Sequence, residues 1–219
     1  MLGRRVLLPL LRFGFRLFYN EFAFSYDAVS ALVSHGRWRA WTDTAIPRIA
    51  GSRVLELPCG TGNLLLDMLS AGHRPIGADL SPAMLGISRR KLQRSQQWTP
   101  LVRMRAQQLG FATGIFDSVV MTFPPSFVSD PAAFAEVRRV MSDHGRLIWV
   151  DSARFVRPGI WSRLVNRWIG FTGGTADYEG LMRQVLAQAG LDSTIEWVRD
   201  DSSEVVIAIG TRSGAAQAV

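Results

Sequence analysis

Short apolar runs alternate with helical patterns along most of the chain. The pair Val54–Leu55 predicts a buried strand, and Leu64, Leu65, Met68 and Leu69 then recur at the spacing of one helix face. Further strands are predicted at 74–79, 101–104, 116–122, 146–150, 193–198 and 204–209, and further helices after Ser81, after Asp130 and at 178–189. This alternation is typical of an α/β fold.

A glycine turn separates the first predicted strand from the helix that follows it. Gly60 and Gly62 allow the backbone to approach a ligand closely at the start of that helix. A dinucleotide would favour a third glycine where this chain has Leu65. Glu56, at the end of the strand, would repel a pyrophosphate but attract the ammonium group of an amino acid. S-adenosylmethionine satisfies both conditions.

A second carboxylate follows the next predicted strand. Asp79 lies 17 residues after Gly62, close to the roughly 20-residue offset at which a carboxylate reaches ribose hydroxyls. Ser81 and Pro82 then provide an N-cap and a first-turn proline for another helix. The glycine turn and the two carboxylates therefore predict one nucleoside site.

Four segments carry a family resemblance, in order along the chain. They are 54–62 (VLELPCGTG), 76–85 (IGADLSPAML), 116–120 (FDSVV), and 136–141 (EVRRVM) leading into 145–148 (GRLI). Together they resemble the class I S-adenosylmethionine-dependent methyltransferases, in particular the ubiquinone/menaquinone C-methyltransferase group. The resemblance implies a Rossmann-like, seven-stranded, mostly parallel sheet with a C-terminal antiparallel hairpin, helices on both faces and an N-terminal helical arm.

The same resemblance implies a set of cofactor contacts. The candidates are Glu56, Pro58, Cys59, Gly60, Thr61, Gly62, Asp79, Leu80, Met84, Ala106, Gln107 and Thr122. Two positions depart from the family pattern. Pro58 replaces a glycine and lacks an N–H donor. Arg105 replaces an acid that would accept from the adenine amino group, which arginine cannot do. We therefore expect the backbone at Ala106 and Gln107 to make the adenine contact.

Composition limits the alternatives. The 219 residues fit one domain, and the only cysteine, Cys59, leaves no intrachain disulfide to form. His35, His73 and His144 show no metal-ligand spacing, so no metal is predicted. The net charge of +7 rests on arginines and a single lysine, Lys91. We interpret the arginines as dispersed along the chain, which makes nucleic acid an unfavoured partner.

The chain divides into an arm, a core and a tail. Residues 1–45 are expected to form a helical arm or lid, 46–211 the cofactor-binding domain with a cap insertion at 154–175, and 212–219 a tail. Within 1–19, Arg5, Arg12 and Arg16 share one stripe of a helix that is otherwise largely apolar. This pattern leaves two interpretations open: an interfacial helix on an anionic membrane, or a lid over the substrate pocket.

Titratable residues near the predicted opening of the substrate pocket are candidates for catalysis. Tyr26 and Asp27 occupy the segment that lies near the cofactor in the quinone methyltransferases, and Tyr26 could place its ring near a sulfonium. His35, Asp151 and Tyr178 are further candidate bases, and the sequence singles out none of the five.

A different amine chemistry is not supported. Adenine and glutamine N-methyltransferases have Asn or Asp before two prolines, whereas this chain has Phe123 before Pro124 and Pro125. We interpret the two prolines as a stiff apolar wall.

The predicted function is S-adenosylmethionine-dependent methyl transfer to a small hydrophobic or lipid-like acceptor, quinone-like or phospholipid-like. An RNA-directed methyltransferase or basic RNA-binding module is one alternative, and a family member that has lost catalysis is another. The expected location is cytoplasmic, with peripheral attachment to the inner face of the membrane if residues 1–19 bind lipid. The acceptor atom and the oligomeric state are left open.

Overall fold

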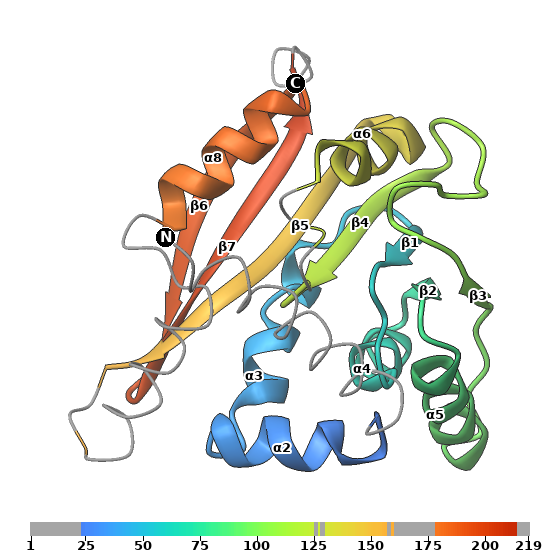
Figure 1. Cartoon of the computed structure of the whole chain (residues 1–219), viewed down its shortest axis with the longest axis vertical. Coiled ribbons are helices and arrows are strands. Elements are labelled where there is room, and N and C mark those ends of the chain that lie inside the picture. The colour runs from blue at the N-terminus through green and yellow to red at the C-terminus, as the bar shows by residue number, and fades with distance from the viewer. Residues whose placement is uncertain (1–22, 125–126, 128–129, 157–158, 160–177, 214–219) are drawn as a thin grey trace, which may run out of the picture.

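A computed structural model describes residues 23–124, 127, 130–156, 159 and 178–213 (Figure 1). Its strands are β1 (Arg53–Glu56), β2 (Arg74–Asp79), β3 (Leu101–Arg103), β4 (Phe116–Thr122), β5 (Met141–Phe155), β6 (Leu191–Arg199) and β7 (Ser203–Arg212). Its helices are η1 (Ala23–Ser25), α2 (Tyr26–Val33), α3 (Trp38–Asp43), η2 (Ile46–Arg48), α4 (Asn63–Ser70), α5 (Pro82–Arg94), α6 (Pro131–Val140) and α8 (Tyr178–Gln188).

The described strands form one sheet in the order β3-β2-β1-β4-β5-β7-β6. The first five strands in this order, β3 to β5, run parallel to one another. β7 runs antiparallel to both β5 and β6, so the chain closes the sheet with a hairpin. The predicted seven-stranded α/β fold with a C-terminal hairpin is therefore confirmed.

Helices cover both faces of the sheet and bury two apolar clusters. On one face, Phe134 and Val137 of α6 and Met182 of α8 pack against the sheet. On the other face, Trp41 of α3 and Leu65 of α4 do so. In the sequence, apolar strands alternate with amphipathic helices. Each helix buries its apolar stripe against the sheet, which produces a helical layer on each face.

The carboxyl ends of the parallel strands meet at one edge of the sheet. Glu56 ends β1, Asp79 ends β2 and Thr122 ends β4. In Figure 1, α2 lies beyond the end of the sheet to which the β4 arrow points. Open α/β sheets bind ligands at this edge, so the fold brings the residues predicted from separate motifs to a common place.

Element boundaries differ from prediction mainly where strands pair for longer than expected. β5 was predicted at 146–150 but extends over Met141–Phe155, because β7 pairs with it as far as Phe155. The insertion expected from residue 154 therefore begins within a strand, and its residues 157–158 and 160–175 lie outside the described part. Residues 1–22 and 214–219 also lie outside it. Among the described helices, none is long and apolar enough to cross a membrane.

Candidate functional site

The glycine turn after β1 is fixed by both neighbouring strands. The N–H of Leu57 donates to the carbonyl of Val120 on β4 at 2.9 Å, and the N–H of Cys59 donates to Ala78 on β2 at 2.9 Å. The Leu57–Pro58 peptide between these two anchors is cis. Because backbone bonds hold the turn from both sides, its position relative to the sheet edge does not depend on long side chains.

The two glycines of the turn have different surroundings. Gly62, with φ at +80°, precedes α4, and a Cβ placed on it would lie 2.2 Å from the hydroxyl oxygen of Ser88. Gly60, with φ at +50°, would place a Cβ in open space, with no atom within 4 Å. Gly62 therefore allows the turn to pack against α5, whereas Gly60 leaves room on the side away from the core.

Glu56 is a buried carboxyl with an unused acceptor. Only 2% of the residue is exposed, and no described group donates to its Oε2 atom. Burial raises its pKa well above the ordinary value, and the charges of Asp79 and Asp67 raise it further. A buried acceptor without a donor is unfavourable, and a cationic ligand beside the glycine turn would remove that penalty.

Asp79 is held in place by backbone donors. Its Oδ2 accepts from the N–H of Gly60 at 2.9 Å, and its Oδ1 accepts from the N–H of Ser81 at 2.8 Å. Burial raises its pKa, while backbone hydrogen bonds from Ser81, Gly60 and Leu80 act in the opposite direction. The carboxylate is therefore oriented beside the open side of Gly60, and each oxygen retains a lone pair for a hydroxyl donor.

These observations fit an S-adenosylmethionine group. Glu56 offers an unpaired acceptor for an ammonium, Asp79 offers acceptors for ribose hydroxyls, and Gly60 leaves open space between strand ends. Arg105, which could have blocked an adenine site, is exposed just after β3. The group would be held by the backbone turn and the two carboxylates.

A polar cluster connects the N-terminal helix to the glycine turn. Oδ1 of Asp27 accepts from the hydroxyl of Thr61 at 2.7 Å and from the amide of Asn63 at 3.1 Å. The Lys91 ammonium donates to Oδ2 of Asp27 and to Oδ1 of Asn63, both at 2.5 Å. We call these four residues the Asp27 clasp. It joins α2, the turn, α4 and α5.

Aromatic rings line the region next to the clasp. Trp38 lies 4.3 Å from Phe123, centroid to centroid, with an interplanar angle of 31°. Tyr26 meets Trp38 edge-on at 6.2 Å, and Trp41 lies 5.7 Å from Phe155. Residues from α2, α3, the end of β4 and the end of β5 thus form one aromatic cluster. Of these rings, only that of Tyr26 was predicted to lie near the cofactor.

Two residues on the neighbouring strands β4 and β5 have costly backbone conformations near the carboxyl edge. Phe123, directly after β4, has φ at +44°, and Ser152 in β5 also has φ at +44°. The β5–β7 register shifts between Asp151 and Ala153, where a bulge interrupts the pairing. Left-handed conformations of residues other than glycine are unfavourable and cluster at functional sites. Their position at the carboxyl edge supports a ligand site there.

Asp151 lies within β5 beside this bulge rather than at the strand end where it was predicted. Its Oδ2 accepts from the indole N–H of Trp149 at 3.1 Å, and its Oδ1 accepts from the N–H of Ser152 at 2.8 Å. Tyr178 also hydrogen-bonds to it. Burial raises the pKa of Asp151 to about 6, and burial together with Asp151 raises the pKa of Tyr178. These two candidates are thus brought together.

The other candidates are dispersed around the edge. His35 packs edge-on against Phe155 at 5.5 Å. Cys59 is buried, and burial raises its thiol pKa well above the ordinary value, which argues against a nucleophilic role. Gln107 donates to Asp130 at 3.0 Å. The remaining predicted contacts range from buried to exposed: Met84 and Ala106 are buried, Thr122 is half-buried and Leu80 is exposed.

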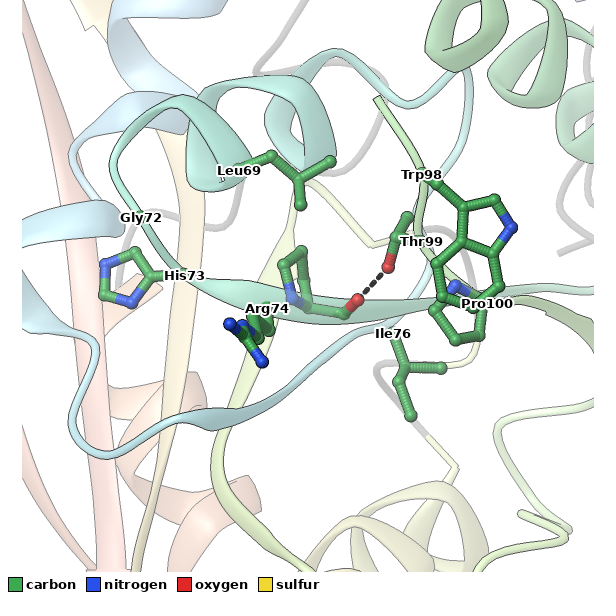
Figure 2. Close-up of a pocket in the computed structure, with 9 residues that line it drawn as sticks. Leu69, Gly72, His73, Arg74, Ile76, Trp98, Thr99 and Pro100 are labelled. Atoms are coloured by element: carbon green, nitrogen blue, oxygen red, sulfur yellow. Dashed lines mark hydrogen bonds between the residues drawn. The ribbon is translucent and has the colours of Figure 1, made fainter. Parts of the chain in front are cut away.

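A surface hollow exists at the opposite end of the strands. It measures about 550 Å³ and is lined largely by apolar groups around Pro75, Trp98 and Pro100 (Figure 2). It lies where β2 and β3 begin, so it is separate from the carboxyl edge, where backbone strain and unpaired polar groups mark the candidate site. In the described residues no group of His, Cys, Asp and Glu is suited to a metal ion.

Sequence reasoning missed Lys91 and Asn63 as members of the site. Lys91 lies 64 residues from Asp27, and no local pattern relates them. One signal was available: Lys91 is the only lysine in a chain otherwise rich in arginine.

Comparisons with known proteins agree with this geometry. The family described as "Methyltransferase domain" matches residues 54–145, which include the glycine turn, Asp79 and β4. A demethylmenaquinone methyltransferase of Symbiobacterium thermophilum is 30% identical over 160 residues, covering 67% of this chain and 63% of that protein. The chain therefore matches less than two thirds of that relative's length.

Longer but weaker similarity covers most of the chain. The ubiquinone/menaquinone biosynthesis C-methyltransferase UbiE of Burkholderia mallei is 26% identical, over 89% of this chain and 90% of that protein. A solved structure, geranyl diphosphate C-methyltransferase from Streptomyces coelicolor A3(2) in complex with S-adenosyl-L-homocysteine, shares the fold with a TM-score of 0.59. It is 15% identical and covers 79% of this chain and 80% of its own. The chain thus carries a class I S-adenosylmethionine-dependent methyltransferase domain and is a distant homologue of the quinone-biosynthesis C-methyltransferases.

Proposed function

We propose that the protein binds S-adenosylmethionine at the carboxyl edge of the sheet and transfers its methyl group to a small, apolar acceptor. The observation that carries this proposal is the buried Glu56 carboxyl, whose Oε2 has no described donor and lies at the end of the strand before the glycine turn. Family membership supports the cofactor, and the relatives named above support an acceptor of the quinone class.

In this proposal the chain mainly positions the reactants. Glu56 binds the ammonium of the cofactor, Asp79 binds the ribose hydroxyls, and the backbone from Cys59 to Gly62 supports the amino-acid portion. The cofactor supplies an activated methyl group on a sulfonium. Because the donor is already activated, orientation and exclusion of water can contribute roughly 7–11 kcal/mol to lowering the barrier.

The remaining predicted contacts complete the proposed cofactor site. Leu80 and Met84 would pack against the adenosine, and the backbone at Ala106 and Gln107 would contact the adenine. Pro58 and Thr61 would shape the turn, and Thr122 would limit the site at the end of β4. The exposure of Arg105 supports a site in which the adenine contacts the neighbouring backbone rather than the guanidinium.

The acceptor is proposed to be a planar or lipid-like apolar molecule. The cluster of Trp38, Trp41 and Phe123 lies on the same sheet face as α3 and α4 and reaches the end of β4. Such rings favour contact with an apolar ligand over a charged one. Quinone-like acceptors are the first choice, and phospholipid-like acceptors are the second.

Some acceptors must lose a proton during methyl transfer, and titratable residues at the carboxyl edge of the sheet would remove it. Asp151 is the candidate with a pKa raised to about 6, which suits a base at neutral pH. Tyr178, hydrogen-bonded to that carboxyl, would orient it.

Calorimetric titration with S-adenosylmethionine tests the proposal directly. Wild-type protein is expected to bind, and Glu56→Gln is expected to bind about 10- to 100-fold more weakly, because a hydrogen bond to a charged group contributes roughly 1.5–3 kcal/mol. Glu179→Gln on α8 is the matched control and should bind as the wild type does. Absence of any binding heat by the wild type would instead favour the interpretation that this family member has lost catalysis.

The acceptor class is tested by transfer of labelled methyl from the cofactor. The acceptors are a short-chain demethylated naphthoquinol and phosphatidylethanolamine, each in detergent. Label on the quinol supports the first choice, and label on the lipid amine supports the second. Transfer to neither, by protein that binds the cofactor, would refute the acceptor proposal while leaving the cofactor site standing.

A further inference from the structure

The outward face of α2 is entirely apolar. Ala28, Val29, Ala31 and Leu32 of α2 are all exposed, as is Phe24 of the preceding turn η1. Phe24 is 76% exposed and Leu32 is 67% exposed. Helices on the surface of a globular protein normally present polar residues to water. A contiguous apolar face of this kind is therefore expected to contact another apolar surface.

A cationic strip lies beside this apolar face. The chain has no aspartate or glutamate between Asp79 and Asp117, and that stretch contains Arg89, Arg90 and Arg94 on α5. All three are exposed. Among the residues that the structure describes, no carboxylate pairs with any of them. The arginines that looked dispersed in the sequence thus leave a local excess of positive charge here.

Unpaired guanidinium groups distinguish α5 from several other parts of the surface. Salt bridges hold many of the other described arginines, namely Arg37, Arg39, Arg48, Arg53, Arg139, Arg154, Arg199 and Arg212. Within the described part of the chain, Lys91 is the only cation of α5 with an ion-pair partner, and that partner, Asp27, lies on α2. The remaining cations of the helix are available to a partner outside the described residues.

The apolar face and the cationic strip are neighbours. The Lys91–Asp27 ion pair joins α5 to α2, and η1, which includes Phe24, contacts α5. At 100° per residue, Arg90 and Arg94 lie on one flank of Lys91, within about 100° of it, and both are exposed. In Figure 1 the two helices lie at the same end of the molecule.

We propose that α2 and α5 form a docking face for an anionic lipid bilayer. The apolar side chains of α2 would enter the interface between head groups and acyl chains, and the arginines of α5 would contact lipid phosphates. This combination of an apolar strip and adjacent unpaired cations is what surface-lying membrane helices use. The face is built from described residues and is separate from the segment 1–19.

The side chains of this face favour lipid over nucleic acid or a second copy of this chain as the binding partner. Nucleic acid would use the arginines but has no use for Val29 and Leu32, which cannot stack on bases. A second copy of this chain would bring the same excess of positive charge, which repels. The Asp27 clasp places this face next to the glycine turn, so docking would bring the cofactor edge close to the bilayer.

Vesicle flotation with the full chain tests the docking face. Phosphatidylcholine vesicles containing phosphatidylglycerol are expected to bind the protein, and pure phosphatidylcholine vesicles are expected to bind far less. Arg90→Gln/Arg94→Gln should lower the partition coefficient roughly twentyfold, since each cation near the surface contributes about fivefold. Arg183→Glu on α8, which changes net charge by the same amount at a distant exposed site, should leave partition unchanged.

A second variant tests the apolar component. Leu32→Ser is expected to lower partition about tenfold, because a buried leucine loses its transfer free energy. Its fold is checked by circular dichroism and by cofactor titration. If Leu32→Ser loses thermal stability but partitions like the wild type, the face is covered by another part of the chain and the proposal is wrong.

Three other results would also overturn it. They are equal binding to neutral and anionic vesicles, equal effects of Arg90→Gln/Arg94→Gln and Arg183→Glu, and concentration-dependent self-association that Leu32→Ser abolishes. Tight binding of a single-stranded RNA probe that Arg90→Gln/Arg94→Gln abolishes, without vesicle binding, would assign the strip to nucleic acid. Cofactor titration of the same variants separates these outcomes from failure of the proposed methyl transfer, since Leu32, Arg90 and Arg94 are not among the proposed cofactor contacts.

Discussion

Glycine at position 62 has two independent reasons to be there. Its φ of +80° is a conformation that side chains rarely adopt, and a Cβ would overlap Ser88 of α5. A residue in a left-handed conformation costs roughly 1–2 kcal/mol. An overlap in a packed region adds typically about 1–3 kcal/mol more.

Gly62→Ala is therefore expected to lower the free energy of unfolding by about 2–5 kcal/mol, as measured by urea denaturation. Gly72→Ala provides the matched control, because Gly72 has φ at +88° and a Cβ added there would meet no atom within 4 Å. The control should lose only the conformational part. Equal losses in the two variants would show that the turn does not pack tightly on α5.

Asp151 links one buried carboxyl to the pH dependence of stability. Burial raises its pKa to about 6 from an ordinary value of 3.8. The folded state therefore holds this proton more tightly than the unfolded chain does. Its favourable contribution is complete below the unfolded pKa and is lost as pH rises through about 6.

Asp151→Asn removes this titration. Between about pH 4 and pH 7, the free energy of unfolding of the variant minus that of the wild type should rise by on the order of 2–3 kcal/mol. The difference between their melting temperatures should rise with it. Differential scanning calorimetry across that range provides the measurement. A difference that stays constant or falls with pH would mean that the carboxyl is not desolvated.

At the scale of elements, the Asp27 clasp determines where α2 sits. It connects one short helix to the glycine turn, α4 and α5 through four side chains. α2 has only eight residues and a mostly exposed, apolar outer face. A helix of that length has little stability of its own, so its position depends on these contacts and on the rings of Tyr26 and Trp38.

A double-mutant cycle measures the clasp. Asp27→Asn and Lys91→Met should each lower the free energy of unfolding by about 1–2 kcal/mol, and the double variant should lose less than the sum. Arg90→Met, one residue away on the exposed side of α5, should cost little. Strict additivity of the two clasp substitutions would indicate that Asp27 and Lys91 do not interact in solution.

How much of these elements the sequence predicts depends on the range of the contacts. The strand, glycine turn and helix at 53–70 are predictable because hydrophobic periodicity and turn chemistry both act within a few residues. The extent of β5 is not, because its pairing is set by β7, which lies far along the chain. The same reason hides the clasp and the placement of Asp151 beside a bulge, where a shift of register redirects the side chains.

For the molecule as a whole, the cofactor and the fold should stabilise each other. Glu56 and Asp79 are buried carboxyls whose pKa values are raised, so the site is electrostatically unfavourable in the described chain. A cationic ligand that binds only the folded state relieves this and shifts the folding equilibrium by mass action.

S-adenosylmethionine at about 100 times its dissociation constant should therefore raise the melting temperature by about 5–10 °C. At the same concentration, S-adenosylhomocysteine, which keeps the ammonium, should also stabilise the protein, whereas adenosine, which lacks it, should do so much less because it binds more weakly. Differential scanning fluorimetry makes the comparison. Equal shifts from adenosine and the full cofactor would remove the role assigned to Glu56.

The clasp also includes the only side-chain amine of the protein. Every other basic side chain that carries a charge at neutral pH is a guanidinium, and Lys91 is held by Asp27 and Asn63. An amine-selective acylating reagent therefore has Lys91 as its single side-chain target. The rate at which Lys91 is acylated in the wild-type protein would then report how often α2 separates from the glycine turn.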